Sequence, residues 1–188
     1  MCIILASSSP RRKKILENLG YNFIIKIPDL DEDNINNLNP IDYVIDVSMR
    51  KGLKIHEQYK NDFVVSGDTI VEFKDKIIGK PTSYKDAFEV LNSFSGQSHY
   101  VISALSLTYN DNQITIFDST KVSFKKLKKG EVEHYLNNFN FLDKAGSYNI
   151  EDVKEYFIKS IDGCYNNIVG FPEKKFLKSE IKQILDLK

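Results

Sequence analysis

Apolar residues recur along the chain in short runs, and their spacing changes from the period of a strand to that of a helix and back. Residues 3–6 form a short apolar strand, after which Ser9 and Pro10 supply a helix N-cap and a first helical residue. Asn39 and Pro40 repeat this signal. The alternation predicts an α/β chain. We expect helices at 10–19, 40–59, between 83 and 96, at 129–137 and from 173 onward, and strands at 3–6, 21–27, 63–73, 77–78, 100–109 and 113–124, with a hairpin over 156–168.

Composition narrows the class of protein. The 188 residues, 41% of them hydrophobic and 28% charged, suit a single globular domain over residues 1–188. Twenty-six basic residues balance 26 acidic ones, so no overall field recruits nucleic acid. Cys2 and Cys164 have no disulfide or zinc spacing, and no run of about 18 apolar residues predicts a membrane span. We therefore expect a cytosolic protein.

Arginine is rare and concentrated. Only Arg11, Arg12 and Arg50 are arginine, which leaves 23 lysines among the 26 basic residues. A guanidinium grips phosphate or carboxylate with two donors at once, which lysine cannot do. Residues 7–12 place three serines and two arginines at a helix start, where backbone N–H groups favour anions. The sequence predicts an anion site there; the alternative is an ordinary capped helix with basic first-turn residues.

Asp68 is the most unusual carboxylate. It lies between two β-branched runs, in Val64-Val65-Ser66-Gly67-Asp68-Thr69-Ile70-Val71. A charge buried in such a strand needs a partner or a metal, so Asp68 is a candidate base or ligand. An exposed position at a bulge beside Gly67 is equally compatible with this segment.

Other charged residues are ambiguous when each is taken alone. The acidic run 31–33 suits either a divalent cation or a solvated loop, and Lys51 and Lys80 suit surface positions as well as ligand contacts. Histidines 56, 99 and 134 have no metal or triad spacing, so we expect structural roles for them.

In combination, these residues resemble a known family. Residues 5–12, Leu-Ala-Ser-Ser-Ser-Pro-Arg-Arg, look like the opening signature of the Maf family of nucleoside triphosphate pyrophosphatases. Six or seven motifs in order are far more specific than one, and they cover nearly the whole chain. The later segments that follow in family order are 50–51, 66–71, 79–81, 96–99, 143–148 and 161–172.

The resemblance implies a fold and an activity. The fold is an elongated mixed α/β sheet with flanking helices and two lobes around a nucleotide-binding cleft, as in Maf and inosine triphosphatase proteins. The implied reaction is hydrolysis of a nucleoside triphosphate to a monophosphate and pyrophosphate, with Mg²⁺ or Mn²⁺ as cofactor. A homodimer is also implied.

The resemblance also assigns roles to residues. Asp68 matches the proposed proton acceptor of the family, and with Glu32 it is implied to hold the metal. Arg12 and Thr69 match positions associated with substrate choice. The residues implied to surround the phosphates are Ser7, Ser9, Arg11, Arg12, Lys51 and Lys80.

A third specificity position departs from the family pattern. The branch that resembles dTTP and UTP pyrophosphatases has glutamine where this chain has Glu151. An ionised glutamate only accepts hydrogen bonds, which suits the N–H groups of guanine better than the mixed edge of uracil. Arg12 nevertheless has the pyrimidine form, so the sequence leans to dTTP, UTP and modified pyrimidine nucleotides, with 7-methyl-GTP or another purine as the alternative. Glu151 could instead face solvent with Asp152, or be protonated if buried.

Two further function classes compete with the enzyme. A nucleotide-binding regulator with little turnover would use the same cations, but it has no use for a carboxylate aimed at phosphates. An RNA-binding module is disfavoured by the balanced charge and by the lack of an aromatic ribonucleoprotein motif.

Overall fold

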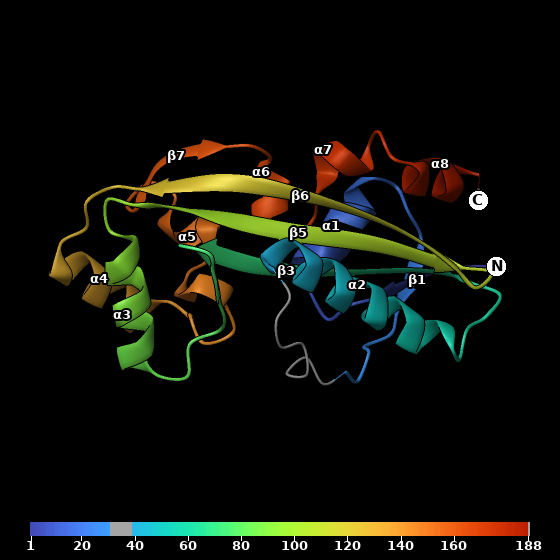
Figure 1. Cartoon of the computed structure of the whole chain (residues 1–188), viewed down its shortest axis with the longest axis horizontal. Helices are drawn as coiled ribbons and strands as arrows, with labels where there is room; N and C mark the ends of the chain where they lie inside the picture. Colours follow the sequence, from blue (N-terminus) through green and yellow to red (C-terminus); the bar gives the residue numbers. More distant parts are fainter. Residues whose placement is uncertain (31–38, 188) are drawn as a thin grey trace.

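The computed structural model describes residues 1–30 and 39–187, which form an elongated molecule built on a seven-stranded sheet (Figure 1). The strands follow the order β2-β1-β3-β5-β6-β7, and β4 pairs with β3 beside this path. β1 is parallel to both its neighbours and the remaining pairs are antiparallel, so the sheet is mixed. The strands are β1 (Ile3–Ala6), β2 (Phe23–Ile25), β3 (Phe63–Phe73), β4 (Lys76–Ile78), β5 (Ser98–Tyr109), β6 (Asn112–Phe124) and β7 (Ile158–Asp162).

Two tight turns connect the antiparallel strands at the predicted places. Asn110 and Asp111 join β5 to β6 with φ of 46° and 59°, and Lys74 and Asp75 join β3 to β4 with φ of 53° and 62°. Two consecutive positive φ values match the twist of paired strands, and Asn and Asp tolerate them better than most residues. The β5–β6 hairpin consequently runs along most of the long axis (Figure 1).

The helix caps predicted at Ser9 and Asn39 are present, and Ser83 caps a third helix. The side chain of Ser9 accepts from the N–H of Arg12, and that of Ser83 accepts from the N–H of Asp86. Asn39 accepts from two N–H groups of the helix that Pro40 begins. The helices are α1 (Pro10–Asn18), α2 (Pro40–His56), α3 (Tyr84–Phe94), α4 (Lys129–Asn138), η1 (Ala145–Ser147), α5 (Ile150–Val153), α6 (Tyr165–Ile168), α7 (Glu173–Phe176) and α8 (Glu180–Asp186).

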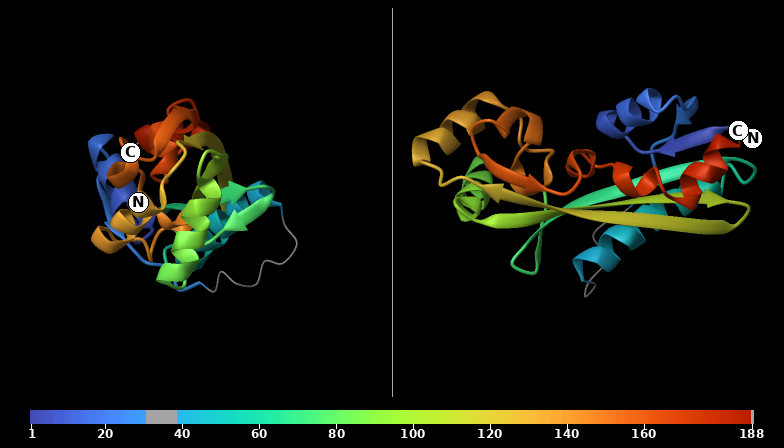
Figure 2. Two further views of the ribbon diagram at one scale, coloured as in Figure 1. Left: turned by 90° about the vertical axis from the view of Figure 1, so that its left-hand side faces the viewer. Right: turned by 90° about the horizontal axis from the view of Figure 1, so that it is seen from above.

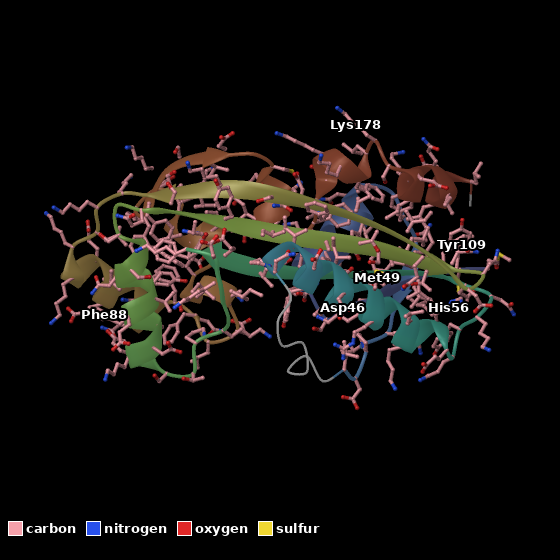
Figure 3. The ribbon with its side chains drawn as sticks, in the orientation of Figure 1. Asp46, Met49, His56, Phe88, Tyr109 and Lys178 are labelled. Carbon is pink, nitrogen blue, oxygen red and sulfur yellow. The ribbon has the colours of Figure 1, made fainter. Side chains whose placement is uncertain are left out.

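Helices cover both faces of the sheet (Figure 2). Side chains alternate along a strand, so Ile4 and Val64 contact Ile55 of α2, whereas Leu5 and Val65 belong to the main core on the opposite face. On the face of the sheet that carries Ile4 and Val64, α2 lies across β3 and β5. His56, at the end of α2, accepts a hydrogen bond from the N–H of Asp111, which fixes the helix to the β5–β6 turn (Figure 3).

The C-terminal third differs from the prediction. The hairpin expected over 156–168 is wrong, because only β7 is a strand and it pairs with β6, while α6 is a helical turn. Thr120 explains the difference, because its hydroxyl donates to the carbonyl of Cys164 and accepts from the N–H of the same residue. These two bonds hold the segment after β7 against β6, where it forms a helical turn instead of a second strand. The single helix expected from Glu173 is two, because Ser179 donates to the carbonyl of Phe176 and caps a new helix.

The molecule has two lobes along its length. α3, α4 and α5 gather at one end, and α1, α8 and both chain termini gather at the other (Figure 1). β5 and β6 run through both lobes. The α/β fold that the sequence pattern predicted and the two-lobed shape that the family resemblance implied are therefore confirmed.

Candidate active site

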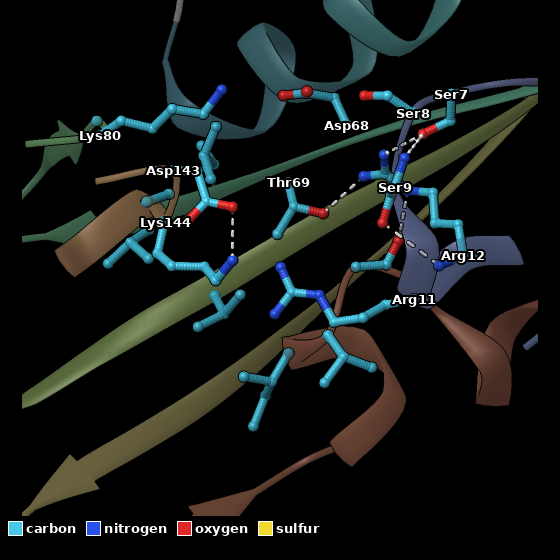
Figure 4. Close-up of a pocket in the computed structure, with 18 of the residues that line it drawn as sticks. Ser7, Ser8, Ser9, Arg11, Arg12, Asp68, Thr69, Lys80, Asp143 and Lys144 are labelled. Carbon is cyan, nitrogen blue, oxygen red and sulfur yellow. Dashed lines mark hydrogen bonds and ion pairs between the residues drawn. The ribbon is translucent and has the colours of Figure 1, made fainter. Parts of the chain in front are cut away.

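A cleft of about 700 Å³ is lined by residues of both lobes, and Figure 4 shows part of its lining. Its polar wall comes from residues 6–12, which form the end of β1 and the start of α1, and from residues 79–80 after β4. The centre of β3 and residues 143–145 and 168–170 also line the cleft, as do Lys51 of α2 and Val101 of β5. Segments far apart in sequence therefore meet at one place.

The centre of β3 is open on one edge. β1 pairs with β3 only as far as Ser66, and β4 pairs with it only from Val71. Residues 67–70 thus have no strand neighbour on this side within the described part of the chain, although β5 pairs with them on the other. Asp68 and Thr69 lie in this gap and line the cleft. Successive side chains of a strand point to opposite faces of the sheet. Asp68 and Thr69 therefore reach the cleft from opposite faces of β3, one with a carboxylate and the other with a hydroxyl.

Asp68 forms an ion pair with Lys51. Lys51 Nζ lies 2.8 Å from Asp68 Oδ1, and the two side chains are only 14% and 13% exposed. Lys51 comes from the fourth turn of α2, so this pair joins that helix to β3. The negative charge of Asp68 is therefore compensated by Lys51. A carboxylate in an apolar strand needs such a partner, and the structure supplies it within the protein.

Arg12 is buried and held on three sides. Its Nε donates to the carbonyl of Gly170 at 2.8 Å, Nη1 to Ser7 Oγ at 3.0 Å, and Nη2 to Thr69 Oγ1 at 2.9 Å. These bonds tie the start of α1 to β3 and to the segment after α6. Lysine could not make all three, because the donors of a guanidinium point in several fixed directions.

The other predicted phosphate contacts surround Arg12. Ser7 and Ser9 line the cleft, and Ser9 also caps α1. Arg11 reaches across the cleft and donates to Asn149 Oδ1 at 3.2 Å. Lys80 is exposed at the opposite rim.

Two predicted residues lie elsewhere. Glu151 is exposed in the first turn of α5 and is not among the residues that line the cleft, although its neighbour Ile150 is. Its charge acts on Tyr165, whose pKa is raised mainly by burial and further by Glu151. Glu32 lies outside the described residues, so its role stays a prediction.

Three lining residues carried no assigned role in the sequence. Lys144 Nζ lies 2.7 Å from Asp143 Oδ2 across the cleft from Thr69 (Figure 4). The hydrogen bond from Lys144 is the main cause that lowers the pKa of Asp143. Tyr148 lines the cleft with its ring, and its hydroxyl lies 2.7 Å from Nε2 of the buried His99. All three fall within the motif 143–148, which was the available signal.

The cleft favours an elongated anion with one apolar end. Among its described lining residues, five cationic side chains face two carboxylates, Asp68 and Asp143. The cations are Arg11, Arg12, Lys51, Lys80 and Lys144. A second part of the wall is apolar and consists of Val71, Ile78, Val101, Ala145, Tyr148, Ile150, Ile168 and Val169. Phosphates suit the first part, and a flat ring suits the second.

Comparisons with known proteins agree with this geometry. The family model described as Maf-like protein matches residues 2–181. A dTTP/UTP pyrophosphatase of Leptospira interrogans is 38% identical over 176 residues, which cover 94% of this chain and 92% of that protein. A dTTP/UTP pyrophosphatase of Clostridium botulinum is 41% identical over 180 residues, or 92% of each chain.

The fold also has a solved counterpart. A HAM1 protein from Coxiella burnetii aligns with 100% of this chain and 98% of its own, at a TM-score of 0.51 and 12% identity. The likeness concerns the fold alone. The family match over residues 2–181 and the two relatives at 38% and 41% identity show that this chain is a member of the Maf-like protein family.

Proposed function

We propose that this protein hydrolyses dTTP, UTP and modified pyrimidine nucleoside triphosphates to the monophosphate and pyrophosphate. The observation that carries the proposal is the Lys51–Asp68 pair in the gap of β3, inside a cleft with an excess of cations. The relatives at 38% and 41% identity, which are named dTTP/UTP pyrophosphatases, support this substrate class.

Asp68 acts as the proton acceptor in this scheme. A water molecule attacks the α-phosphorus, its proton passes to the carboxylate, and the bond from that phosphorus to the bridging oxygen of the β-phosphate breaks. The electron pair leaves with pyrophosphate. Lys51 holds one oxygen of Asp68 at 2.8 Å, so the carboxylate keeps one orientation toward the cleft.

The cations act on the charge that develops. Arg11 and Lys80 stand at opposite rims, from which both can reach phosphate oxygens, and Ser7 and Ser9 offer hydroxyls at the positive end of α1. A triphosphate brings about four negative charges, which these side chains neutralise as pyrophosphate leaves. Arg12, Thr69 and Glu151 are assigned to substrate choice, Glu151 from outside the lining of the cleft.

The donor set fits a divalent cation that the substrate helps to bind. No group of three or more His, Cys, Asp or Glu side chains suited to a metal occurs in residues 1–30 and 39–187. Mg²⁺ is commonly held by one or two carboxylates together with substrate phosphates, and Asp68 supplies one such carboxylate. Bound there, Mg²⁺ or Mn²⁺ would neutralise phosphate charge and lower the pKa of a coordinated water. Glu32 is the second carboxylate in this proposal.

We further propose a homodimer in the cytosol. Both cysteines are unpaired, as is usual in a reducing compartment. Within the described residues, no helix combines the length and apolar character that a bilayer span requires. Light scattering on the purified protein measures the assembly directly.

The test is pyrophosphate release from a panel of triphosphates: dTTP, UTP, CTP, GTP, ITP, 7-methyl-GTP and modified pyrimidines. Each is assayed with Mg²⁺, with Mn²⁺ and with chelator. We expect metal-dependent release, fastest for dTTP and UTP. Preference for 7-methyl-GTP would overturn the pyrimidine assignment, and tight nucleotide binding without release from any substrate would indicate a regulator instead.

A further inference from the structure

A chain of hydrogen bonds runs from Arg12 through Thr69 into the sheet. Arg12 Nη2 donates to Thr69 Oγ1 at 2.9 Å, and Thr69 Oγ1 lies 2.9 Å from Ser103 Oγ on the neighbouring strand β5. Ser103 Oγ then donates to the backbone carbonyl of Asn167 at 2.7 Å. The chain thus begins at a cation and ends at a carbonyl.

These two ends fix the direction of every proton between them. A carbonyl only accepts, so the single hydroxyl proton of Ser103 belongs to Asn167. A guanidinium only donates, so one lone pair of Thr69 belongs to Arg12. The hydroxyl proton of Thr69 must therefore point to Ser103. One lone pair of Thr69 Oγ1 remains available to a ligand. Toward the cleft, the Thr69 hydroxyl can therefore accept a hydrogen bond but cannot donate one.

The far end of the chain is rigid. Ser103 and Asn167 are completely buried, and Asn167 Nδ2 donates to the carbonyl of Val101 and to Thr120 Oγ1. These bonds hold α6 against β5 and β6. The carbonyl of Asn167 also accepts from the N–H of Gly170 at 3.0 Å, so reversal of the hydroxyl directions would remove one of its two donors in a buried place, which is unfavourable.

Thr69 faces the apolar part of the cleft. It is one residue from Asp68, so the two side chains leave β3 on opposite faces. Asp68 meets Lys51 on the α2 face, whereas Thr69 shares its face with Val71, and Ser103 shares that face with Val101. Both valines line the cleft. A nucleobase that lies on these apolar side chains brings its polar edge to Thr69.

We infer that Ser103 is a positioning residue for base selection: it keeps Thr69 as a pure acceptor, which favours bases with a ring N3–H. Uracil and thymine carry that proton, whereas N3 of cytosine is itself an acceptor and would face the lone pair of Thr69. The inference rests on the proposed function, and it supplies a physical reason for preferring UTP and dTTP to CTP.

The test is the ratio of kcat/KM for UTP to that for CTP. In Ser103→Ala, the Thr69 proton loses its acceptor and can turn toward the cleft, where it can bond N3 of cytosine. We expect the ratio to fall by about tenfold or more, the range set by one hydrogen bond left unmade. Ser106→Ala is the matched control, because Ser106 is equally buried on β5 but bonds Ser48 and Thr115 on the other face.

A double variant separates this role from general damage. Once Thr69→Val has removed the acceptor, adding Ser103→Ala should leave the ratio unchanged. An equal fall in both activities of Ser103→Ala, with the ratio of the wild type, would overturn the inference.

The wild-type protein provides an independent reading with N3-methyluridine triphosphate, which lacks the N3 proton. We expect its kcat/KM to lie at least about tenfold below that of UTP. Equal rates for the two nucleotides would overturn the role of Thr69 as acceptor. If the wild type released no pyrophosphate from UTP at all, the proposed function would fail, and this inference would fail with it. The same assay therefore distinguishes the two failures: equal rates overturn the inference alone, and absence of release overturns the proposed function.

Discussion

Several polar side chains inside this protein bond one another in pairs, as Ser48 and Ser106 do. His99 shows how strongly burial acts on such a group: it is 1% exposed, stacks on Phe94, and has Nε2 2.7 Å from the hydroxyl of Tyr148. Desolvation lowers its pKa from 6.5 to about 3. The ring is therefore neutral at pH 7 and supports the cleft through Tyr148. The sequence predicted a structural role for His99 from spacing alone, but the partner, 49 residues away, was not readable.

The depressed pKa of His99 predicts how stability depends on pH. The unfolded chain takes up a proton near pH 6.5 and the folded one only near pH 3, so the contribution of His99 to stability is complete above 6.5 and declines as pH falls through that window. We expect the free energy of unfolding to drop by about 1 kcal/mol between pH 7 and pH 5.5. Urea unfolding at both pH values measures it.

His99→Gln is the control for that measurement. This variant has no ring to protonate, so it should be less stable at pH 7 but show a flatter profile from pH 7 to 5.5. A profile as steep as that of the wild type would assign the pH dependence to other groups.

At the scale of elements, the site depends on where strands stop pairing. β3 is eleven residues long, yet β1 and β4 leave its centre open, and the segment after α6 closes over Arg12. Local signals predicted the helix starts well, because a cap and its helix are adjacent in sequence. They failed for α6, which is held by Thr120 and Asn167 through contacts with distant strands. Local sequence patterns also could not predict the registers in which β1 and β4 pair with β3.

Gly170 tests this arrangement. It has φ of +100°, and an added Cβ would lie 3.1 Å from Thr69 Oγ1 and 3.5 Å from Arg12 Nη2. We expect Gly170→Ala to lower stability by about 1–2 kcal/mol and kcat/KM for UTP by about tenfold or more, since both strain and displacement of the Arg12–Thr69 bond follow. Thermal unfolding and steady-state kinetics measure the two effects.

Gly20 offers a matched control, because it also has positive φ, at +86°, but an added Cβ would meet no atom within 4 Å. Gly20→Ala should lose stability through strain and keep its kcat/KM. Similar kinetic losses in both variants would show that strain alone accounts for the effect at Gly170.

At the scale of the whole molecule, zero net charge conceals a strongly polarised cleft. The sequence predicted that any phosphate binding must be local, and the fold gathers five cationic side chains from four separate segments around Asp68. The type of chemistry was thus predictable from residues 7–12 and from the unusual place of Asp68. The Lys51 partner was not, since only the packing of α2 on β3 brings the two together. Tyr148 was missed for the same reason.

The cleft also sets binding apart from catalysis. Arg11 and Lys80 approach from opposite rims, and neither contact requires Asp68. Nucleotide affinity should therefore survive a change that removes only the ability of Asp68 to accept a proton.

The most direct measurement is pyrophosphate release from UTP by Asp68→Asn, with the affinity for a non-hydrolysable UTP analogue measured on the same preparation. Asparagine has nearly the shape of aspartate but cannot take the proton, so we expect kcat to fall by about 10²–10⁴-fold while affinity stays within about threefold. Ser106→Ala serves as the folded control. An Asp68→Asn protein that releases pyrophosphate at the wild-type rate would contradict the assignment of Asp68 as the base and, with it, the central claim about this cleft.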